Sequence, residues 1–293
     1  MQNEREDDRG AWLKIWHFPL VTMCVAATAM IAVLGLSEWV MRFVPEGLDR
    51  NVDVIVRYGF TILAAILVYK LVIPRLGAHK HDDLPMRGAI SGMSLGLGAG
   101  IVVFSCVIAA AAIGGYYTIV GPGSWVDFIE ILMTTGLAAS VIEEILFRGI
   151  LFRWLEEFSG SWIALFLSSA IFGFMHLPSD NPNLLIGVII ALEGGMLLTA
   201  AYMLTRNLWL AIGLHAGWNI AQAFIWGVPM KGFEFEGLVQ GQTSGPAWLS
   251  GGTFGMEMSV FGVVVTVTAG LLLLRAAYRK GRFVPPMWKQ ERS

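Results

Sequence analysis

The chain has 293 residues, of which 56% are hydrophobic and only 14% carry a charge. Because a soluble domain has roughly 25% charged residues, this composition excludes an ordinary water-soluble protein and favours one embedded in a lipid bilayer. The net charge is −2, and no strongly basic block points to a nucleic-acid partner.

Apolar runs long enough to cross a bilayer, about 20 residues each, recur along the chain. They predict an all-α, polytopic membrane protein with about eight transmembrane helices. In chain order, the predicted spans are 17–36, 55–73, 88–113, 125–147, 161–178, 184–204, 207–227 and 258–277. The fourth span is expected to continue as a helix to residue 158 and to end in a turn at Ser159 and Gly160.

The spans divide the chain into three parts. Residues 1–124 hold N-terminal transmembrane helices and loops, 125–227 form a core of helices four to seven, and 228–293 hold an outside loop, the last transmembrane helix and a basic cytoplasmic tail. Residues 237–255 are rich in Gly and Ser, so we expect this outside loop to be irregular.

The distribution of Lys and Arg predicts the orientation in the membrane. With the N-terminus in the cytoplasm and eight spans, only Arg42, Arg50 and Lys231 fall in outside segments. Arg57 lies within the second span, and all the others of the 20 basic residues fall on the cytoplasmic side. Because cytoplasmic loops carry an excess of Lys and Arg, we predict that both termini are cytoplasmic. We expect the membrane to be a bacterial cytoplasmic membrane.

Two sets of glycines predict close contacts between helices. Gly92, Gly96 and Gly100 recur at four-residue spacing and so line one face of the third span. Gly213 and Gly217, which have no side chains, leave room for another helix beside the seventh span. Small residues at such spacing let a neighbouring helix approach closely, so we assign the three-glycine stripe to packing and not to chemistry.

Three groups of polar residues interrupt the apolar spans, and the first is Glu143, Glu144 and Arg148. A charged side chain at the bilayer centre costs roughly 2.5–3.5 kcal/mol on insertion scales and often marks a functional site. Glu144 and Arg148 are four residues apart on one helix face, so we expect them to pair. Glu143 points about 100° away from Glu144, which leaves its carboxylate free for another role.

The second group is Phe172 and His176, and the third is His215 and Asn219, and the two members of each group are four positions apart. Glu143 and His176 each lie about 16 residues from the predicted turn, roughly 24 Å along their helices. His215 and Asn219 reach overlapping depths if the helices are tilted by ordinary amounts. We therefore predict one cavity inside the membrane that brings together an acid, two imidazoles and an amide.

Other titratable residues are not assigned to this predicted cavity. Glu193 is an intramembrane acid at comparable depth, but no motif surrounds it, so a packing role and a site role both stay open. His17, His79 and His81 lie at membrane edges or in a charged loop, where we expect them to be solvated.

The three polar groups, in this order, resemble the motifs of the CPBP family, also called Abi, of CAAX prenyl proteases and bacteriocin-processing or immunity proteins. The family pattern is EExxxR, then FxxxH, then HxxxN or HxxxD, and the chain matches all three within residues 125–227. The resemblance implies an all-helical intramembrane endopeptidase that acts on a membrane-anchored protein or peptide. It implies that Glu143, His176, His215 and Asn219 are catalytic, with Glu144 and Arg148 in support.

The leading hypothesis is hydrolysis of a peptide bond in or beside the membrane. A water molecule held by Glu143 and His176 would lose a proton to the carboxylate, and His215 and Asn219 would hold the resulting oxyanion. The alternative is a zinc-dependent version, with Glu143, His176 and His215 as ligands and Glu144 as the base. We favour the version without a cofactor because Glu144 is expected to pair with Arg148 and because the motif HExxH is absent.

Two other functions use residues of the same kind. Buried acids and histidines also form the proton relays of transporters, but the chain shows no inverted repeat and no matching pair of broken helices. A non-catalytic bacteriocin-immunity or binding protein is the other alternative, and the three intact motifs argue against it.

Overall fold

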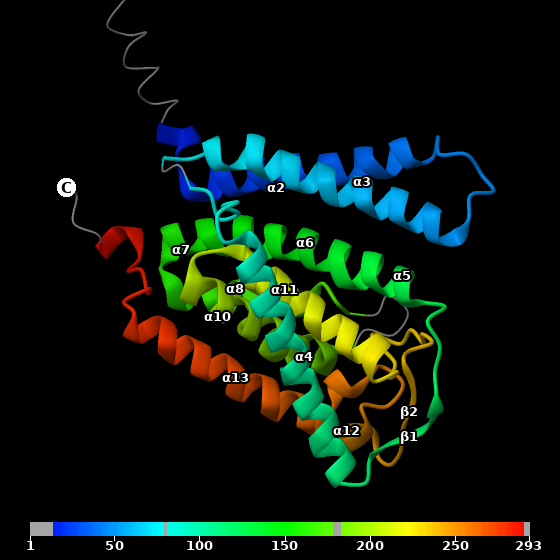
Figure 1. Ribbon diagram of the computed structural model, residues 1–293. Helices are drawn as coiled ribbons and strands as arrows, with labels where there is room; N and C mark the ends of the chain where they lie inside the picture. The colour runs from blue at the N-terminus through cyan, green and yellow to red at the C-terminus, as the bar shows by residue number, and fades with distance from the viewer. Residues whose placement is uncertain (1–13, 79–80, 178–182, 290–293) are drawn as a thin grey trace, which may run out of the picture.

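The computed structural model describes residues 14–78, 81–177 and 183–289, and these ranges form a helical bundle with a small sheet at one end (Figure 1). The N-terminal helices are α2 (Pro19–Met41), α3 (Arg50–Leu71) and α4 (Ala89–Ile113). A long helix follows, in which α5 (Phe128–Ile131), α6 (Ala139–Glu144) and α7 (Arg153–Ser159) are joined by the π-helical segments Leu132–Ala138 and Ile145–Phe152.

Four further helices complete the bundle. They are α8 (Ser161–Phe174), α9 (Leu184–Ile190) with α10 (Met196–Thr205), α11 (Leu208–Ile220) and α13 (Val260–Arg279). The π-helical segment Ala191–Gly195 joins α9 to α10, and another, Ala221–Ile225, extends α11. Short elements complete the chain: 3-10 turns at Ile73–Arg75, Met256–Met258 and Met287–Lys289, and the helix α12 (Ala247–Ser250).

The helices confirm an all-α, polytopic membrane protein. Within the described ranges, six helical stretches are long and apolar enough to cross a membrane, and they match six of the eight predicted spans. These are Pro19–Met41, Arg50–Arg75, Ala89–Ile113, Leu184–Thr205, Leu208–Ile225 and Val260–Arg279. The fourth predicted span lies in the long helix, which carries the charged motif. The fifth corresponds to α8, whose 14 residues span roughly 21 Å, too short to cross the hydrocarbon core.

Capping residues explain where several helices begin. The side chains of Asp49, Asn183, Asn207 and Ser259 accept backbone N–H groups at the starts of α3, α9, α11 and α13. Gly160 has φ of +80° and lets the chain reverse between α7 and α8, at the turn that the sequence predicts. This turn aligns the long helix with α8.

The two sets of glycines meet each other, because α4 packs along α11. A Cβ atom added to Gly96 would lie 2.3 Å from the carbonyl oxygen of Leu210. A Cβ atom on Gly217 would lie 2.2 Å from the carbonyl oxygen of Leu97. The predicted role in close packing is therefore confirmed, and this contact holds in place the helix that carries His215.

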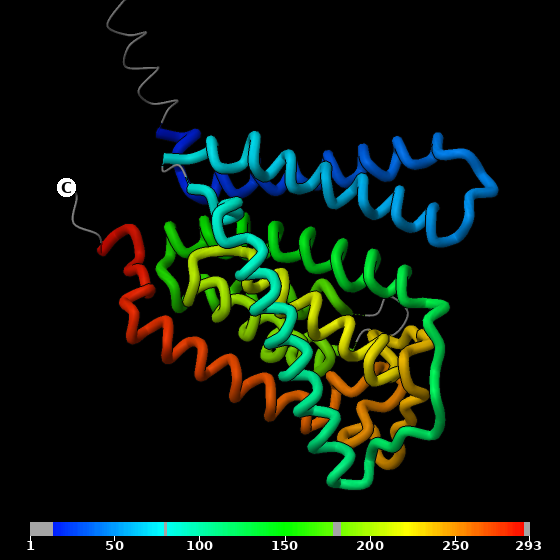
Figure 2. Tube along the Cα trace, viewed as in Figure 1, coloured from blue at the N-terminus to red at the C-terminus, as the bar shows by residue number. Residues whose placement is uncertain are grey.

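The hairpin of α2 and α3 lies along the long helix on the outside of the bundle (Figure 2). At one end of the hairpin, Arg50 pairs with Asp127 at 2.8 Å. Near its other end, the Tyr69 hydroxyl donates to Asp83 at 2.9 Å, and Asp83 also lies 3.5 Å from Arg153. Polar contacts at both ends thus tie the hairpin to the core.

The expectation of an irregular loop at residues 237–255 was wrong. Strand β2 (Val239–Thr243) pairs in antiparallel fashion with β1 (Tyr117–Pro122), with Tyr117 opposite Thr243, and α12 follows. The pairing joins segments that are far apart in the sequence and that have little alternation of polar and apolar residues. The backbone N–H and C=O groups of each strand are satisfied by the other strand, and this pairing cannot be predicted from the local sequence of either one.

Candidate functional site

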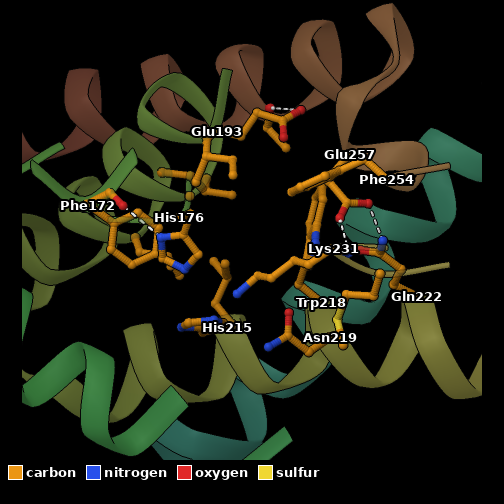
Figure 3. Close-up of a pocket in the computed structure, with 17 residues that line it drawn as sticks. Phe172, His176, Glu193, His215, Trp218, Asn219, Gln222, Lys231, Phe254 and Glu257 are labelled. Carbon is orange, nitrogen blue, oxygen red and sulfur yellow. Dashed lines mark hydrogen bonds between the residues drawn. The ribbon is translucent and has the colours of Figure 1, made fainter. Parts of the chain in front are cut away.

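A cavity of about 70 Å³ lies among α8, α10, α11 and the segment before α13 (Figure 3). It has room for water molecules. Three of the predicted site residues, His176, His215 and Asn219, line it, and so does Glu193. Most of the other lining side chains are apolar, so polar groups in the cavity act in a medium of low polarity.

Glu144 and Arg148 form the predicted ion pair. The Arg148 Nη1 donates to Glu144 Oε1 at 2.8 Å, and both side chains are almost completely buried. Three more of its N–H groups donate to Thr199 Oγ1 at 3.2 Å and to the carbonyls of Gly194 and Gly195 at 2.8 and 3.0 Å. Arg148 therefore links the long helix to the α9–α10 helix.

The carboxylate of Glu143 faces the two imidazoles. Its Oε2 lies 3.5 Å from Nε2 of His176 and 3.9 Å from Nε2 of His215. This oxygen is buried and has no hydrogen-bond partner among the described residues. The side chains of the two neighbouring acids thus point in different directions, as predicted: Glu144 is paired with Arg148, and Glu143 points toward the histidines.

Each imidazole is oriented by a second hydrogen bond. His176 Nδ1 lies 2.7 Å from the carbonyl of Phe172, which can only accept, so Nδ1 carries the proton and Nε2 of the neutral ring is an acceptor. His215 Nδ1 lies 3.0 Å from Glu144 Oε1, so Glu144 serves both Arg148 and His215. Both rings therefore present Nε2 toward Glu143.

The amide of Asn219 has one hydrogen available. Its Nδ2 donates to the Thr135 carbonyl at 2.7 Å, and this contact identifies the nitrogen end because a carbonyl cannot donate. The second N–H of the amide has no acceptor among the described residues and can bind another group. Asn219 lies one turn beyond His215 on the cavity side of α11, as the sequence predicts.

Phe172 connects the motif residues by its ring and by its backbone. The Arg148 guanidinium lies 4.6 Å from the centre of the Phe172 ring, and the ring centres of Phe172 and His176 are also 4.6 Å apart. Because the ring contacts the cation and the imidazole while its carbonyl orients His176, the aromatic residue has a positioning role.

Residues 125–221 match the family model described as Rce1-like, type II CAAX prenyl endopeptidase Rce1-like. The matched range contains all three motifs and the whole arrangement around Glu143. This part of the chain is similar to that family and is called the Rce1-like region below. The match confirms the resemblance to the CPBP family, which includes CAAX prenyl proteases. No curated protein and no solved structure matches the chain.

Among the described residues, three π-helical segments lie within the Rce1-like region and a fourth, Ala221–Ile225, begins at its last residue. The first two flank Glu143 and Glu144, and the third provides the carbonyls of Gly194 and Gly195 that bind Arg148. π-Helical turns are rare and are frequently found at functional sites. Here they alter the register of three helices beside the buried charges.

Gln222, Lys231 and Glu257 are among the cavity residues that were not predicted as site residues. Gln222 Nε2 donates to the carbonyl of Pro229 at 2.7 Å and also to Glu257, and Glu257 accepts the Lys231 backbone N–H at 3.1 Å. Lys231 and Glu257 lie beyond the Rce1-like region, in loops that fold back over it. Gln222 lies three residues after Asn219, and this helical spacing was a signal that could have found it. Glu193 joins the cavity wall and lies 3.4 Å from the Thr266 hydroxyl.

The zinc alternative requires three ligands and a free base. Within the described ranges, no group of three or more His, Cys, Asp or Glu side chains is arranged to hold a metal ion. Glu144, the base in that alternative, is held by Arg148 and His215. Glu144 is therefore not free to act as the base of the zinc alternative. The metal-free version stays a prediction, and no step is written through a metal.

Proposed function

We propose that the protein is an intramembrane endopeptidase that hydrolyses a peptide bond of a membrane-associated protein or peptide without a metal. The observation that carries the proposal is the separation of 3.5 Å between Glu143 Oε2 and His176 Nε2. An ionised carboxylate and the free nitrogen of a neutral imidazole are both acceptors. A water molecule can donate one hydrogen to each, which holds its oxygen beside both groups.

The carboxylate of Glu143 acts as the general base. It takes a proton from the water as the oxygen forms a bond to the carbonyl carbon of the substrate. When the tetrahedral intermediate collapses, the carbon–nitrogen bond breaks and the same proton passes to the leaving amine. The products are a carboxylic acid and an amine, Glu143 returns to its ionised form, and transfer of the acid proton then gives a carboxylate and an ammonium ion.

The oxyanion of the intermediate is stabilised from the other side of the cavity. The free N–H of Asn219 and a protonated Nε2 of His215 act as donors. For Nε2 to donate, the His215 ring must carry a second proton, and Glu144 at 3.0 Å from Nδ1 stabilises that charge. Glu144 and Arg148 thus have a positioning role, and Glu143, His176, His215 and Asn219 contact the reacting atoms.

A cleavage assay tests this proposal. Enzyme reconstituted in liposomes is incubated with a pool of N-acylated peptides, and the products are identified by mass spectrometry. We expect Glu143→Gln, His176→Ala and His215→Ala each to reduce cleavage by at least about 10³-fold while the protein stays folded in detergent. Glu157→Gln, an isosteric change on the same helix outside the cavity, is the matched control. Cleavage by folded Glu143→Gln at the parent rate would refute the general-base role.

Metal dependence is tested separately. We expect purified active enzyme to contain no stoichiometric zinc by elemental analysis and to keep its activity after exhaustive chelation. Loss of activity on chelation, with recovery when zinc is added, would overturn the metal-free mechanism and leave the peptidase proposal in place.

A further inference from the structure

Lys231 is a charged cavity residue to which the proposed mechanism gives no role. It is the only Lys or Arg between Arg206 and Arg275, and it lies in the loop that follows α11. The sequence assigns it to an outside segment, but its side chain points into the cavity toward His176 and His215 (Figure 3). A positive charge therefore lies in the same cavity as the predicted catalytic groups.

The ammonium group of Lys231 is not used by an ion pair of the protein. Among the residues that the structure describes, no carboxylate lies within 4.0 Å of its Nζ. Glu257 accepts from Gln222 and from the backbone N–H of Lys231, and Glu193 lies near Thr266. By contrast, Arg148, which is buried beside the same site, donates to Thr199, Glu144 and the carbonyl of Gly194.

The backbone at Lys231 is held in an uncommon conformation. Its φ of +51° is in the left-handed region, which residues other than glycine rarely adopt. The N–H bond to Glu257 at 3.1 Å and the bridges from Met230 to Phe233 and Gly255 hold the loop in this shape. The surrounding structure therefore orients this side chain into the cavity, and such strain is often found at functional sites.

We propose that Lys231 binds a carboxylate group of the substrate and so makes the enzyme selective for peptides that carry a carboxylate near the bond to be cut. The inference rests on the proposed function and adds a determinant of specificity to it. The apolar wall of the cavity, with Leu197 and Phe254 among its residues, suits an apolar side chain beside that carboxylate. An ion pair in such surroundings is stronger than one in water.

Two sources can supply this carboxylate: the free C-terminus of the peptide or the side chain of an Asp or Glu. The probe is a pool of N-acetylated pentapeptides of Leu, Ile, Val, Met and Phe, made in three forms. One form has a free C-terminal carboxylate, the second has a C-terminal amide, and the third has the amide and one internal Glu. Comparison of the three forms identifies the source.

Binding is measured first, with a background that cannot cleave. Glu143→Gln protein in detergent is mixed with each pool, and retained peptides are quantified by mass spectrometry against protein-free micelles. We expect at least about a tenfold preference for a carboxylate-bearing form over the amide. Adding Lys231→Met should reduce this preference to within about twofold, whereas Lys231→Arg should retain most of it. Lys280→Met, the same change at an exposed position at the end of α13, is the matched control.

Equal retention of the three forms by the parent, or an unchanged preference after Lys231→Met, would overturn the inference. Melting temperatures of the variants are compared in the same detergent. If Lys231→Met does not fold, Lys231→Gln takes its place, and Lys231→Arg must still retain the preference.

Cleavage kinetics with active enzyme separate this inference from the proposed function. We expect Lys231→Met to raise KM for the preferred form by at least about tenfold and to leave kcat within about threefold. A loss confined to kcat would place Lys231 at the reacting atoms and refute substrate binding. If none of the pools is cleaved but the binding preference depends on Lys231, the proposed function fails while the binding site stands.

Discussion

At the scale of single residues, the site depends on one carboxylate that has two partners. Glu144 Oε1 accepts from Arg148 and from His215, so it neutralises a buried cation and orients a predicted catalytic ring. The neighbouring acid, Glu143, is left to face the histidines. Adjacent residues of the same type thus have different roles because the helical twist separates their side chains by about 100°.

We predict that Glu144→Gln lowers stability by about 3–5 kcal/mol, because Arg148 then remains buried without its counter-ion. The measurement is the unfolding midpoint in detergent. Replacing both residues with apolar ones should restore stability in part, although the carbonyls of Gly194 and Gly195 would lose a donor. Equal midpoints for Glu144→Gln and the parent would contradict the importance of the pair.

Glu257 leads to a prediction about pH. It lies just before α13, and burial raises its pKa from 4.5 to about 7. The folded protein therefore binds this proton more tightly than the unfolded chain does. The resulting stability is fully present below about pH 4.5 and is lost as the pH rises through about 7.

We predict that the parent loses on the order of 3 kcal/mol of stability relative to Glu257→Gln between pH 4.5 and pH 7.5, since the glutamine cannot ionise. Unfolding by denaturant in detergent, repeated across this range, measures the difference. Glu234→Gln, at an exposed position in the same loop region, is the control and should follow the parent. Parallel curves for the parent and Glu257→Gln would refute the prediction.

At the scale of secondary-structure elements, the contact between α4 and α11 positions the helix that carries His215 and Asn219. Helix α4 lies outside the Rce1-like region, yet its glycines determine how closely it approaches α11. A Cβ atom on Gly100 would lie 2.2 Å from the carbonyl of Leu214, directly before His215. The distance between α4 and α11 at Gly100 therefore affects the position of His215 in the site.

We predict that Gly100→Ala destabilises the protein by about 1–3 kcal/mol and lowers kcat, because α11 must move away from α4. Gly98→Ala is the matched control on the same helix, since an added Cβ there meets no atom within 4 Å. Thermal unfolding and cleavage assays on both variants measure the effect. A loss of equal size in the two variants would point to helix propensity and not to the contact.

At the scale of the whole molecule, the connections that carry most of the basic residues lie at one end of the bundle, and the β1–β2 sheet lies at the other (Figure 1). Contacts join these basic connections to one another: Arg206 pairs with Glu156 and also binds the carbonyl of Arg282. Lys70 pairs with Asp82 at the same end. The predicted orientation requires these basic connections to lie on the same side of the membrane, and their position at one end of the bundle agrees with it.

We predict that the end with the basic residues faces the cytoplasm. After replacement of Cys24 and Cys106 by serine, a cysteine at Ser244 should react with an impermeant reagent added outside intact cells. A cysteine at Met86 should react only after the membrane is opened. The reverse pattern would invert the topology.

The sequence by itself determined the properties that depend on composition and on neighbours along a helix. These include the membrane class, the positions of the helices, the turn at Gly160, the pairing of Glu144 with Arg148 and the three motifs. Hydropathy and the 3.6-residue period are local, so one sequence suffices to predict them. The catalytic roles of the motif residues remain predictions.

Only the tertiary structure decided which distant segments meet. It paired β1 with β2, placed α4 against α11, and brought Lys231 and Glu257 from loops into the cavity. In the sequence, Lys231 is a lone cation in an outside segment, and nothing local shows where its side chain points. Such contacts depend on how the helices pack and how the loops return over them, which the period of a single helix does not encode.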